Sequence, residues 1–134
     1  MTKTYTGSCH CGAVRFEADI DLSKGTFKCN CSICTKSRNW LAMVKPEAFR
    51  LLKGEADLAD YQFGRKVIHH LFCRHCGIHP FGWADSPDFG GKGYAVNILS
   101  LDDVPEKELV DAPVTYTDGR NDNWKEPPTE TRYL

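Results

Sequence analysis

Three kinds of feature are missing from this chain of 134 residues, and each absence narrows what the protein can be. No apolar stretch approaches the length of a membrane span, and no apolar h-region appears in the N-terminal segment. We therefore expect neither a membrane segment nor a secretory signal. No basic run is present and the formal net charge is −1, which gives a nucleic-acid partner no electrostatic support. These absences predict a cytoplasmic protein in a compartment that keeps thiols reduced.

Long helical patterns are also scarce, and short strands separated by turns dominate the pattern. Residues 13–20 alternate apolar and polar side chains, as a half-buried strand does. The other predicted strands cover residues 40–44, 50–53, 58–63, 67–72, 78–84 and 94–99. Brief helical turns are expected at 32–37, 45–49 and 104–110, and a loop at the glycine-rich 85–93. Because no repeat or linker divides the chain, we expect one mainly β domain over residues 1–134, with its core at about 5–125.

All seven cysteines fall into three tight clusters. The clusters are a C-x-C, a C-x-C-x-x-C and a C-x-x-C, formed in turn by Cys9 and Cys11, by Cys29, Cys31 and Cys34, and by Cys73 and Cys76. In a reducing compartment such clusters usually hold metal or carry out redox chemistry. An odd number of thiols disfavours a disulfide framework, and Gly77 and Pro80 break the helix that a thioredoxin-type motif needs.

The seven thiols divide naturally into four and three. Four thiolates close a tetrahedral zinc site, whereas three leave one position open. Cysteines separated by one residue on a strand point to the same face, so Cys9 and Cys11 can reach one ion. The C-x-x-C with its following glycine resembles a zinc knuckle, whose tight turn wraps a metal. We therefore predict a structural Zn²⁺ that contributes folding free energy and is held by Cys9, Cys11, Cys73 and Cys76.

The remaining triplet, Cys29, Cys31 and Cys34, can hold a second Zn²⁺ with one position free for water or a substrate thiol. The residues leave two alternatives open: a closed site completed by a histidine, and three reduced thiols without metal. The candidate histidines are His10, His69, His70, His75 and His79, of which His79 is best placed. The flanking cations that could favour thiolate or bind an anionic ligand are Lys28, Lys36 and Arg38.

Taken together, the clusters resemble the glutathione-dependent formaldehyde-activating (GFA) family, which includes centromere protein V-like members. The segments that carry the resemblance are CHCG at 9–12, CNCSIC at 29–34 and CRHCGIHPF at 73–81. Their order and spacing are similar over roughly residues 5–125. The later Asp118-Gly119-Arg120, with Trp124, also resembles a tail pattern of relatives.

The resemblance implies an Mss4-like fold, a twisted β-sheet domain built around zinc with few short helices. It implies the same division of thiols, with a structural zinc at the four-cysteine group and a catalytic zinc at Cys29, Cys31 and Cys34. It further implies a zinc-dependent carbon–sulfur lyase that forms or cleaves S-hydroxymethylglutathione, the adduct of formaldehyde and glutathione.

On this interpretation a small thiol such as glutathione occupies the open position of the triplet, where zinc lowers the thiol pKa or polarises an aldehyde oxygen. Lys36 or Arg38 would bind its carboxylates, and His79 is a candidate general base. Two other functions are compatible with the sequence: a non-catalytic, zinc-stabilised binding module with an exposed apolar patch, and a redox or zinc sensor at the triplet. The sequence does not specify an oligomeric state.

Overall fold

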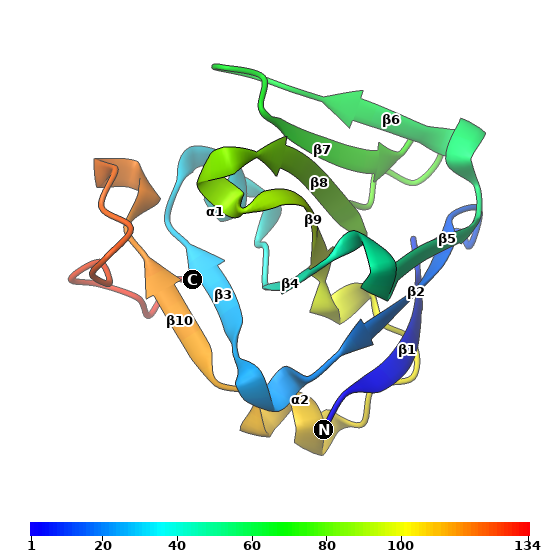
Figure 1. Cartoon of the computed structure of the whole chain (residues 1–134), viewed down its shortest axis with the longest axis horizontal. Coiled ribbons are helices and arrows are strands. Elements are labelled where there is room, and N and C mark those ends of the chain that lie inside the picture. Colours follow the sequence, from blue (N-terminus) through cyan, green and yellow to red (C-terminus); the bar gives the residue numbers. More distant parts are fainter.

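The computed structural model describes all 134 residues and consists mainly of strands (Figure 1). The strands are β1 (Lys3–Ser8), β2 (Arg15–Ile20), β3 (Thr26–Cys29), β4 (Leu41–Val44), β5 (Phe49–Lys53), β6 (Leu58–Tyr61), β7 (Ile68–Cys73), β8 (Phe81–Ser86), β9 (Gly91–Asn97) and β10 (Val114–Thr117). The two α-helices, α1 (Ser32–Ser37) and α2 (Glu106–Asp111), have six residues each. The expected mainly β fold with few short helices is confirmed.

The strands form two sheets whose twist is visible in Figure 1. The smaller sheet has the order β1-β2-β5, and the larger has seven strands in the order β10-β3-β4-β9-β8-β7-β6. Every neighbouring pair is antiparallel except β10 and β3, which run parallel. That exception joins a late segment of the chain to an early one, and both of these strands lead into the candidate site.

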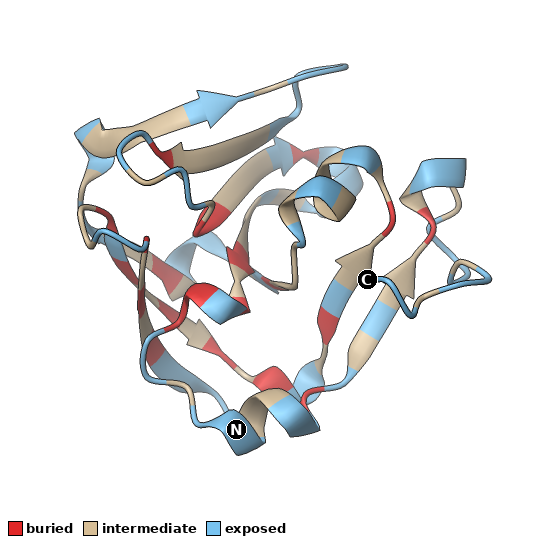
Figure 2. Ribbon diagram, turned by 180° about the vertical axis from the view of Figure 1, so that it is seen from behind, coloured by how far each residue is buried: buried red, intermediate tan, exposed pale blue.

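The core lies where the two sheets face each other, and its buried segments are the red parts of the ribbon in Figure 2. Phe16 on β2 is fully buried and stacks on Phe49 of β5, with ring centroids 5.5 Å apart. Phe49 in turn stacks on Tyr94 of β9 at 4.2 Å. Gly7 is required beside this stack, because a Cβ atom there would lie only 2.3 Å from the Phe16 ring. Aromatic packing of this kind adds to the free energy gained by burial alone.

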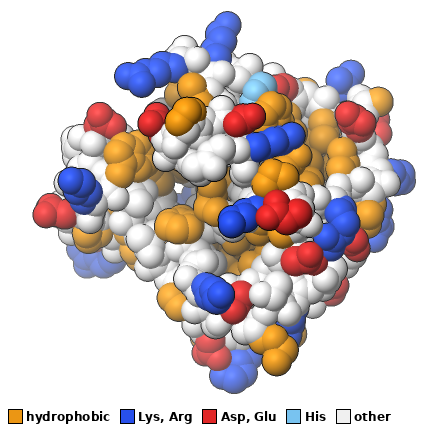
Figure 3. Space-filling model, in the orientation of Figure 1, with side chains coloured by type: hydrophobic (Ala, Val, Ile, Leu, Met, Phe, Trp, Pro, Cys, Tyr) orange, Lys and Arg blue, Asp and Glu red, His pale blue; other side chains and the backbone are white.

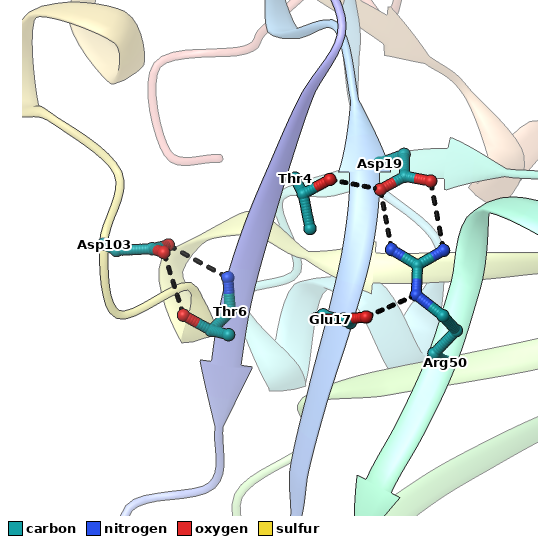
Figure 4. A network of polar contacts seen from close by, with 6 residues as sticks. All are labelled: Thr4, Thr6, Glu17, Asp19, Arg50 and Asp103. Atoms are coloured by element: carbon teal, nitrogen blue, oxygen red, sulfur yellow. Dashed lines mark hydrogen bonds and ion pairs between the residues drawn. The ribbon is translucent and has the colours of Figure 1, made fainter.

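A polar network ties the outer face of the small sheet together (Figure 4). Arg50 of β5 binds Asp19 of β2 through both terminal nitrogens, at 3.1 and 2.7 Å, and its Nε donates to Glu17 at 2.5 Å. Thr4 of β1 donates to the same Asp19 at 2.7 Å. The Asp19 carboxylate therefore links all three strands, and these hydrogen bonds from Arg50 and Thr4 lower the pKa of Asp19 to about 2.

The structure agrees with most of the predicted elements and corrects one of them. Residues 32–37 do form a helix, and residues 13–20 contain β2. The predicted loop at 85–93 is wrong, because β8 continues to Ser86 and β9 already begins at Gly91. Only a short 3₁₀ turn, Pro87–Phe89, joins these two strands, and Gly90 closes it with a positive φ of 76°. The glycines there serve a tight hairpin, so they mark a turn rather than a long loop.

Strands β1, β3 and β10 were not predicted. Strand β1 has six residues but only one large apolar side chain, Tyr5, and β3 and β10 have four residues each, too few to establish an alternation. The surface in Figure 3 carries hydrophobic side chains gathered near its centre and right, with acidic and basic side chains interspersed among them. None of the helices has the length and apolar character needed to cross a membrane.

Candidate metal centres

Four cysteine sulfurs from opposite halves of the chain meet at one point. The Sγ atoms of Cys9, Cys11, Cys73 and Cys76 all lie within 4.8 Å of one another. Cys11 Sγ is 3.6 Å from both Cys9 Sγ and Cys73 Sγ. Four sulfurs bound at 2.3 Å around a tetrahedral ion would be about 3.8 Å apart, so the group has the size of a closed zinc site.

The turn that carries Cys9 and Cys11 differs from the expected strand. Strand β1 ends at Ser8, and both cysteines lie in the turn that follows it, where the Gly12 amide donates to the Cys9 carbonyl at 3.3 Å. Gly12 has a φ of +81°, a conformation that glycine adopts without strain. The two thiols still reach one centre, but through a tight turn and not through the alternation of a strand.

The second turn, which follows β7, also ends on a glycine with a positive φ. Cys73 is the last residue of β7, and the Gly77 amide donates to its carbonyl at 2.8 Å, with a φ of +78° at Gly77. Backbone amides also point at the sulfurs: Val14 N lies 3.3 Å from Cys9 Sγ, and His75 N lies 3.4 Å from Cys73 Sγ. Such N–H···S bonds stabilise thiolates and are typical of the surroundings of bound metal.

The pKa of Cys76 shows this stabilisation most clearly. Desolvation acts to raise its pKa, but hydrogen bonds from the backbone amides of Ile78 and Cys11, together with those from the Cys73 and Cys9 thiols, bring it down to about 6. A thiol with this pKa is ionised at neutral pH and is ready to bind a cation. The Ala13 backbone acts to lower the pKa of Cys11, but desolvation and the contacts with the other three thiols raise it to about 11, so ionising all four thiols requires a cation.

The triplet is assembled where β3 passes into α1. Cys29 ends β3, Cys31 is the N-cap residue of α1, and Cys34 lies in its first turn. Their sulfurs also lie within 4.8 Å of one another, and all three residues are half-buried. The helical turn is what folds three close cysteines around one point, since an extended segment would place them along a line.

Hydrogen bonds within the triplet favour a thiolate at Cys29. Bonds from the side chains of Cys31 and then Cys34 hold the pKa of Cys29 far below its usual range, and the same contacts with Cys29 raise the pKa of both partners. The Cys31 amide lies 3.4 Å from Cys29 Sγ, and Asn39 Nδ2 lies 3.6 Å from Cys34 Sγ. Ionising all three thiols requires a cation to offset their mutual repulsion.

No histidine joins the triplet, which bears directly on the closed-site alternative. No histidine nitrogen lies within 4.8 Å of all three sulfurs. His69 binds Asp60 at 2.5 Å, His75 binds Asp57 at 2.7 Å, and His70 lies 2.9 Å from the Tyr61 carbonyl. His79 packs against Phe72 at 5.2 Å, and burial lowers its pKa. None of the histidines is therefore placed to act as a fourth ligand beside the three cysteines.

A buried hydrogen-bond network, which we call the polar brace and which consists of Asn30, Asp118 and Arg120, holds the triplet against the segment that follows β10. Asn30, only 4% exposed, donates to the Asp118 carboxylate at 2.7 Å and accepts from the Arg120 amide at 3.0 Å. The Arg120 guanidinium also donates to the Asn30 carbonyl at 3.2 Å. Hydrogen bonds from Asn121 and Asn30 lower the pKa of Asp118, which keeps it ionised. Asn30 therefore fixes the position of Cys29 and Cys31 on either side of it.

Gly119 belongs to the same segment, and its backbone lies close to Cys29 and Cys31. A Cβ atom at Gly119 would lie 2.7 Å from Cys29 Sγ and 3.1 Å from Cys31 Cβ. Sequence reasoning assigned Asn30 no role in the site, and it recognised Asp118-Gly119-Arg120 only as a family-like tail pattern. The tail pattern could have pointed to these residues, but their contact with the triplet depends on the pairing of β10 with β3, which was not predicted.

A cavity of about 120 Å³ opens beside the triplet. Its walls include Lys28, Cys29, Cys34, Arg38, Tyr133 and Leu134. Lys28 Nζ lies 5.0 Å from the ring centroid of Trp40, which forms an apolar wall. The Thr35 hydroxyl also lies at this cavity, buried and without a hydrogen-bond partner. The triplet therefore faces a space with cationic, apolar and hydrogen-bonding walls, whereas the four-cysteine group closes on itself.

Comparisons with known proteins agree with this geometry. The sequence model of the family described as "Glutathione-dependent formaldehyde-activating enzyme" matches residues 4–118. A crystal structure of a Rhodobacter sphaeroides protein superimposes with a TM-score of 0.69 at 32% sequence identity. That alignment covers 82% of this chain and 99% of the other. The family match includes all seven cysteines and ends just before Gly119.

Proposed function

Because the chain belongs to the glutathione-dependent formaldehyde-activating enzyme family, we propose that it is a zinc-dependent carbon–sulfur lyase. Its substrate is the adduct of a thiol and an aldehyde, such as S-hydroxymethylglutathione. The proposed structural zinc is held by Cys9, Cys11, Cys73 and Cys76, and the proposed catalytic zinc by Cys29, Cys31 and Cys34. This gives two zinc ions per chain, with glutathione as the small-molecule thiol partner.

One observation carries this proposal: the two cysteine groups differ in size, and the smaller one lines a cavity through Cys29 and Cys34. Four sulfurs satisfy a tetrahedral ion, whereas three would leave one position for a ligand from the cavity. A non-catalytic module would need neither the open position nor a cavity beside it.

The proposed reaction moves one proton between two atoms of the substrate. In the cleavage direction the carbon–sulfur bond breaks, the sulfur keeps the electron pair, and the hydroxyl proton leaves as the aldehyde C=O bond forms. The net result is transfer of a proton from oxygen to sulfur. Zinc bound to the triplet would supply stabilisation of the thiolate that leaves.

The surrounding side chains have defined parts in this chemistry. Lys28 and Arg38 line the cavity and offset the negative charge of three thiolates, which would otherwise oppose a fourth. The Trp40 wall and the neighbouring Leu99 exclude water from one side of the cavity. Asn39 donates to Cys34 Sγ and orients that ligand. Holding the thiol and aldehyde fragments together in this space favours their reaction in either direction.

The test is turnover of S-hydroxymethylglutathione by the pure, zinc-loaded protein, measured as release of formaldehyde. We expect turnover by the wild type and a loss of at least about 100-fold in Cys31→Ser, because a removed ligand disturbs the open site. Lys45→Gln, which changes an exposed side chain outside the cavity wall, is the matched control. Equal rates for the wild type and Cys31→Ser would refute the catalytic proposal.

A further inference from the structure

The cavity beside the triplet is partly filled by the protein's own chain. Arg38 Nη1 donates to the Tyr133 carbonyl at 2.8 Å, and Lys28 Nζ donates to the Leu134 main-chain oxygen at 3.4 Å. Figures 1 and 2 both show this end of the ribbon lying beside β3, with the tail loop next to β10. Both cations that line the cavity therefore already bind oxygen atoms of one short segment.

Arg38 is held in an unusual conformation that directs it to this place. It follows α1 with a φ of +54°, a left-handed conformation that non-glycine residues rarely adopt. Its amide closes the helix by donating to the Thr35 carbonyl at 3.3 Å. Backbone strain of this kind is often kept at binding sites, where it presents a side chain in a required direction.

With this segment in place, the cavity is too small for a tripeptide thiol. Its volume is about 120 Å³, whereas pockets for small-molecule ligands usually measure roughly 300–1,000 Å³. The segment supplies the walls made by Tyr133 and Leu134. Moving it would enlarge the cavity and free two cations, next to an unpartnered Thr35 hydroxyl.

We propose that the segment 130–134 competes with an anionic thiol substrate for Arg38 and Lys28. A carboxylate of the substrate takes the place of the Tyr133 and Leu134 oxygens, and the segment leaves the cavity as the substrate enters. A carboxylate is a better partner for Arg38 than the Tyr133 carbonyl, because it carries a full negative charge and can accept two parallel hydrogen bonds from the guanidinium. The inference rests on the proposed function for the choice of thiol, and it selects carboxylate-bearing thiols over neutral ones.

The test separates binding from chemistry by using S-methylglutathione, which keeps both carboxylates but has no free thiol. Its affinity for the zinc-loaded protein is measured by calorimetry. Arg38→Asn suits the left-handed backbone and should weaken binding about tenfold, the size of one charge-assisted hydrogen bond. Tyr133→Gly keeps the competing carbonyl but makes the segment more flexible, and should tighten binding several-fold. Lys45→Gln, which changes an exposed cation outside the cavity wall, should stay within about twofold.

A second measurement follows the segment itself. In ¹⁵N-labelled protein, the amide signals of Tyr133 and Leu134 should move toward positions typical of a disordered chain when S-methylglutathione is added. Equal affinities in the wild type, Arg38→Asn and Lys45→Gln would overturn the proposal. So would weaker binding by Tyr133→Gly, which would make the ring part of the binding site, or unmoved amide signals at saturation.

The two proposals fail in different ways. If S-hydroxymethylglutathione is not turned over but the affinities follow the expected order, the lyase function is refuted and the competition stands. If turnover occurs but the affinities do not depend on Arg38 or Tyr133, only the competition is refuted.

Discussion

At the scale of single residues, the geometry of the triplet requires a glycine at position 119, because glycine has no Cβ atom. The backbone of this residue lies so close to Cys29 and Cys31 that any side chain would press on both ligands. Asn30, between those two cysteines, is buried and fixed by Asp118 and Arg120. The residues that set the geometry of the site are therefore not themselves ligands, which is common around bound metal.

Gly119→Ala tests this close approach. The new Cβ atom would lie 2.7 Å from Cys29 Sγ, so either the sulfur or the turn after β10 must shift. We expect the affinity of the triplet for metal to fall roughly 10- to 100-fold, as for other changes around metal ligands. Competition with a chelating dye would measure it.

The matched control is Gly93→Ala on β9, where a Cβ atom would make an ordinary contact of 3.6 Å with the Val44 carbonyl. This control should retain the metal affinity of the wild type. Unchanged affinity in Gly119→Ala would show that the turn after β10 yields without disturbing Cys29.

At the scale of elements, the pairing of short strands decides where the site lies. Strand β10 runs parallel to β3, and Asp118, Gly119 and Arg120, which follow its end, therefore lie beside the triplet. On the small sheet, Arg50 joins β5 to β2 through Asp19. These cross-strand contacts hold together segments that are far apart in sequence.

The Asp19–Arg50 contact predicts a dependence on pH. The folded pKa of Asp19, about 2, lies below its ordinary value of 3.8, so the contact stabilises the fold above about pH 4. This contribution is lost as the pH falls from 4 toward 2. In Arg50→Gln we expect the Asp19 pKa to return toward its ordinary value, as measured by NMR titration of the carboxyl carbon.

Arg132→Gln is the control, since Arg132 pairs with Glu130 only two residues away and joins no strands. It should leave the Asp19 pKa unchanged. An Asp19 pKa that stays near 2 in Arg50→Gln would mean that Thr4 alone is sufficient to lower it.

The cysteine pattern predicted much more of the site than the strand patterns did. Spacing alone divided the thiols into the two groups that the structure brings together, because nearby cysteines have few geometries open to them. The contact between β3 and β10 could not be predicted in this way. Both are four-residue strands, and Thr26 and Pro113, which hydrogen-bond at one end of the pair, are separated by 87 positions. Nothing local in either strand specifies such a partner, so the brace and the cavity emerged only with the fold.

At the scale of the whole molecule, the two cysteine groups should differ in their effect on stability. The four-cysteine group joins the turn after β1 to the turn after β7, and so connects the small sheet to the large one. The triplet lies within a single local segment, residues 29–34. A metal at the first group should therefore stabilise the entire fold, whereas a metal at the second should mainly order its own loop.

Cys73→Ser and Cys31→Ser make the comparison. Removing the buried Cys73 should lower the free energy of unfolding by more than about 4 kcal/mol, because loss of a metal is among the largest single effects on stability. Cys31→Ser should lower it by less than about 2 kcal/mol, while abolishing metal binding at the triplet. Urea unfolding with metal analysis measures both, and equal destabilisation by the two variants would contradict the division into structural and catalytic groups.

The parallel pairing of β3 with β10 has a consequence for how the protein matures. Asn30 and its partner Asp118 are 88 positions apart, so a ribosome that adds roughly 5–20 residues per second needs about 4–18 s to produce the second after the first. During that interval the triplet has emerged without the loop that later covers it, and its thiols are open to oxidants and to adventitious ions. We therefore expect the triplet to take up its proposed metal late in biogenesis, and the nascent chain to depend until then on surroundings that keep thiols reduced.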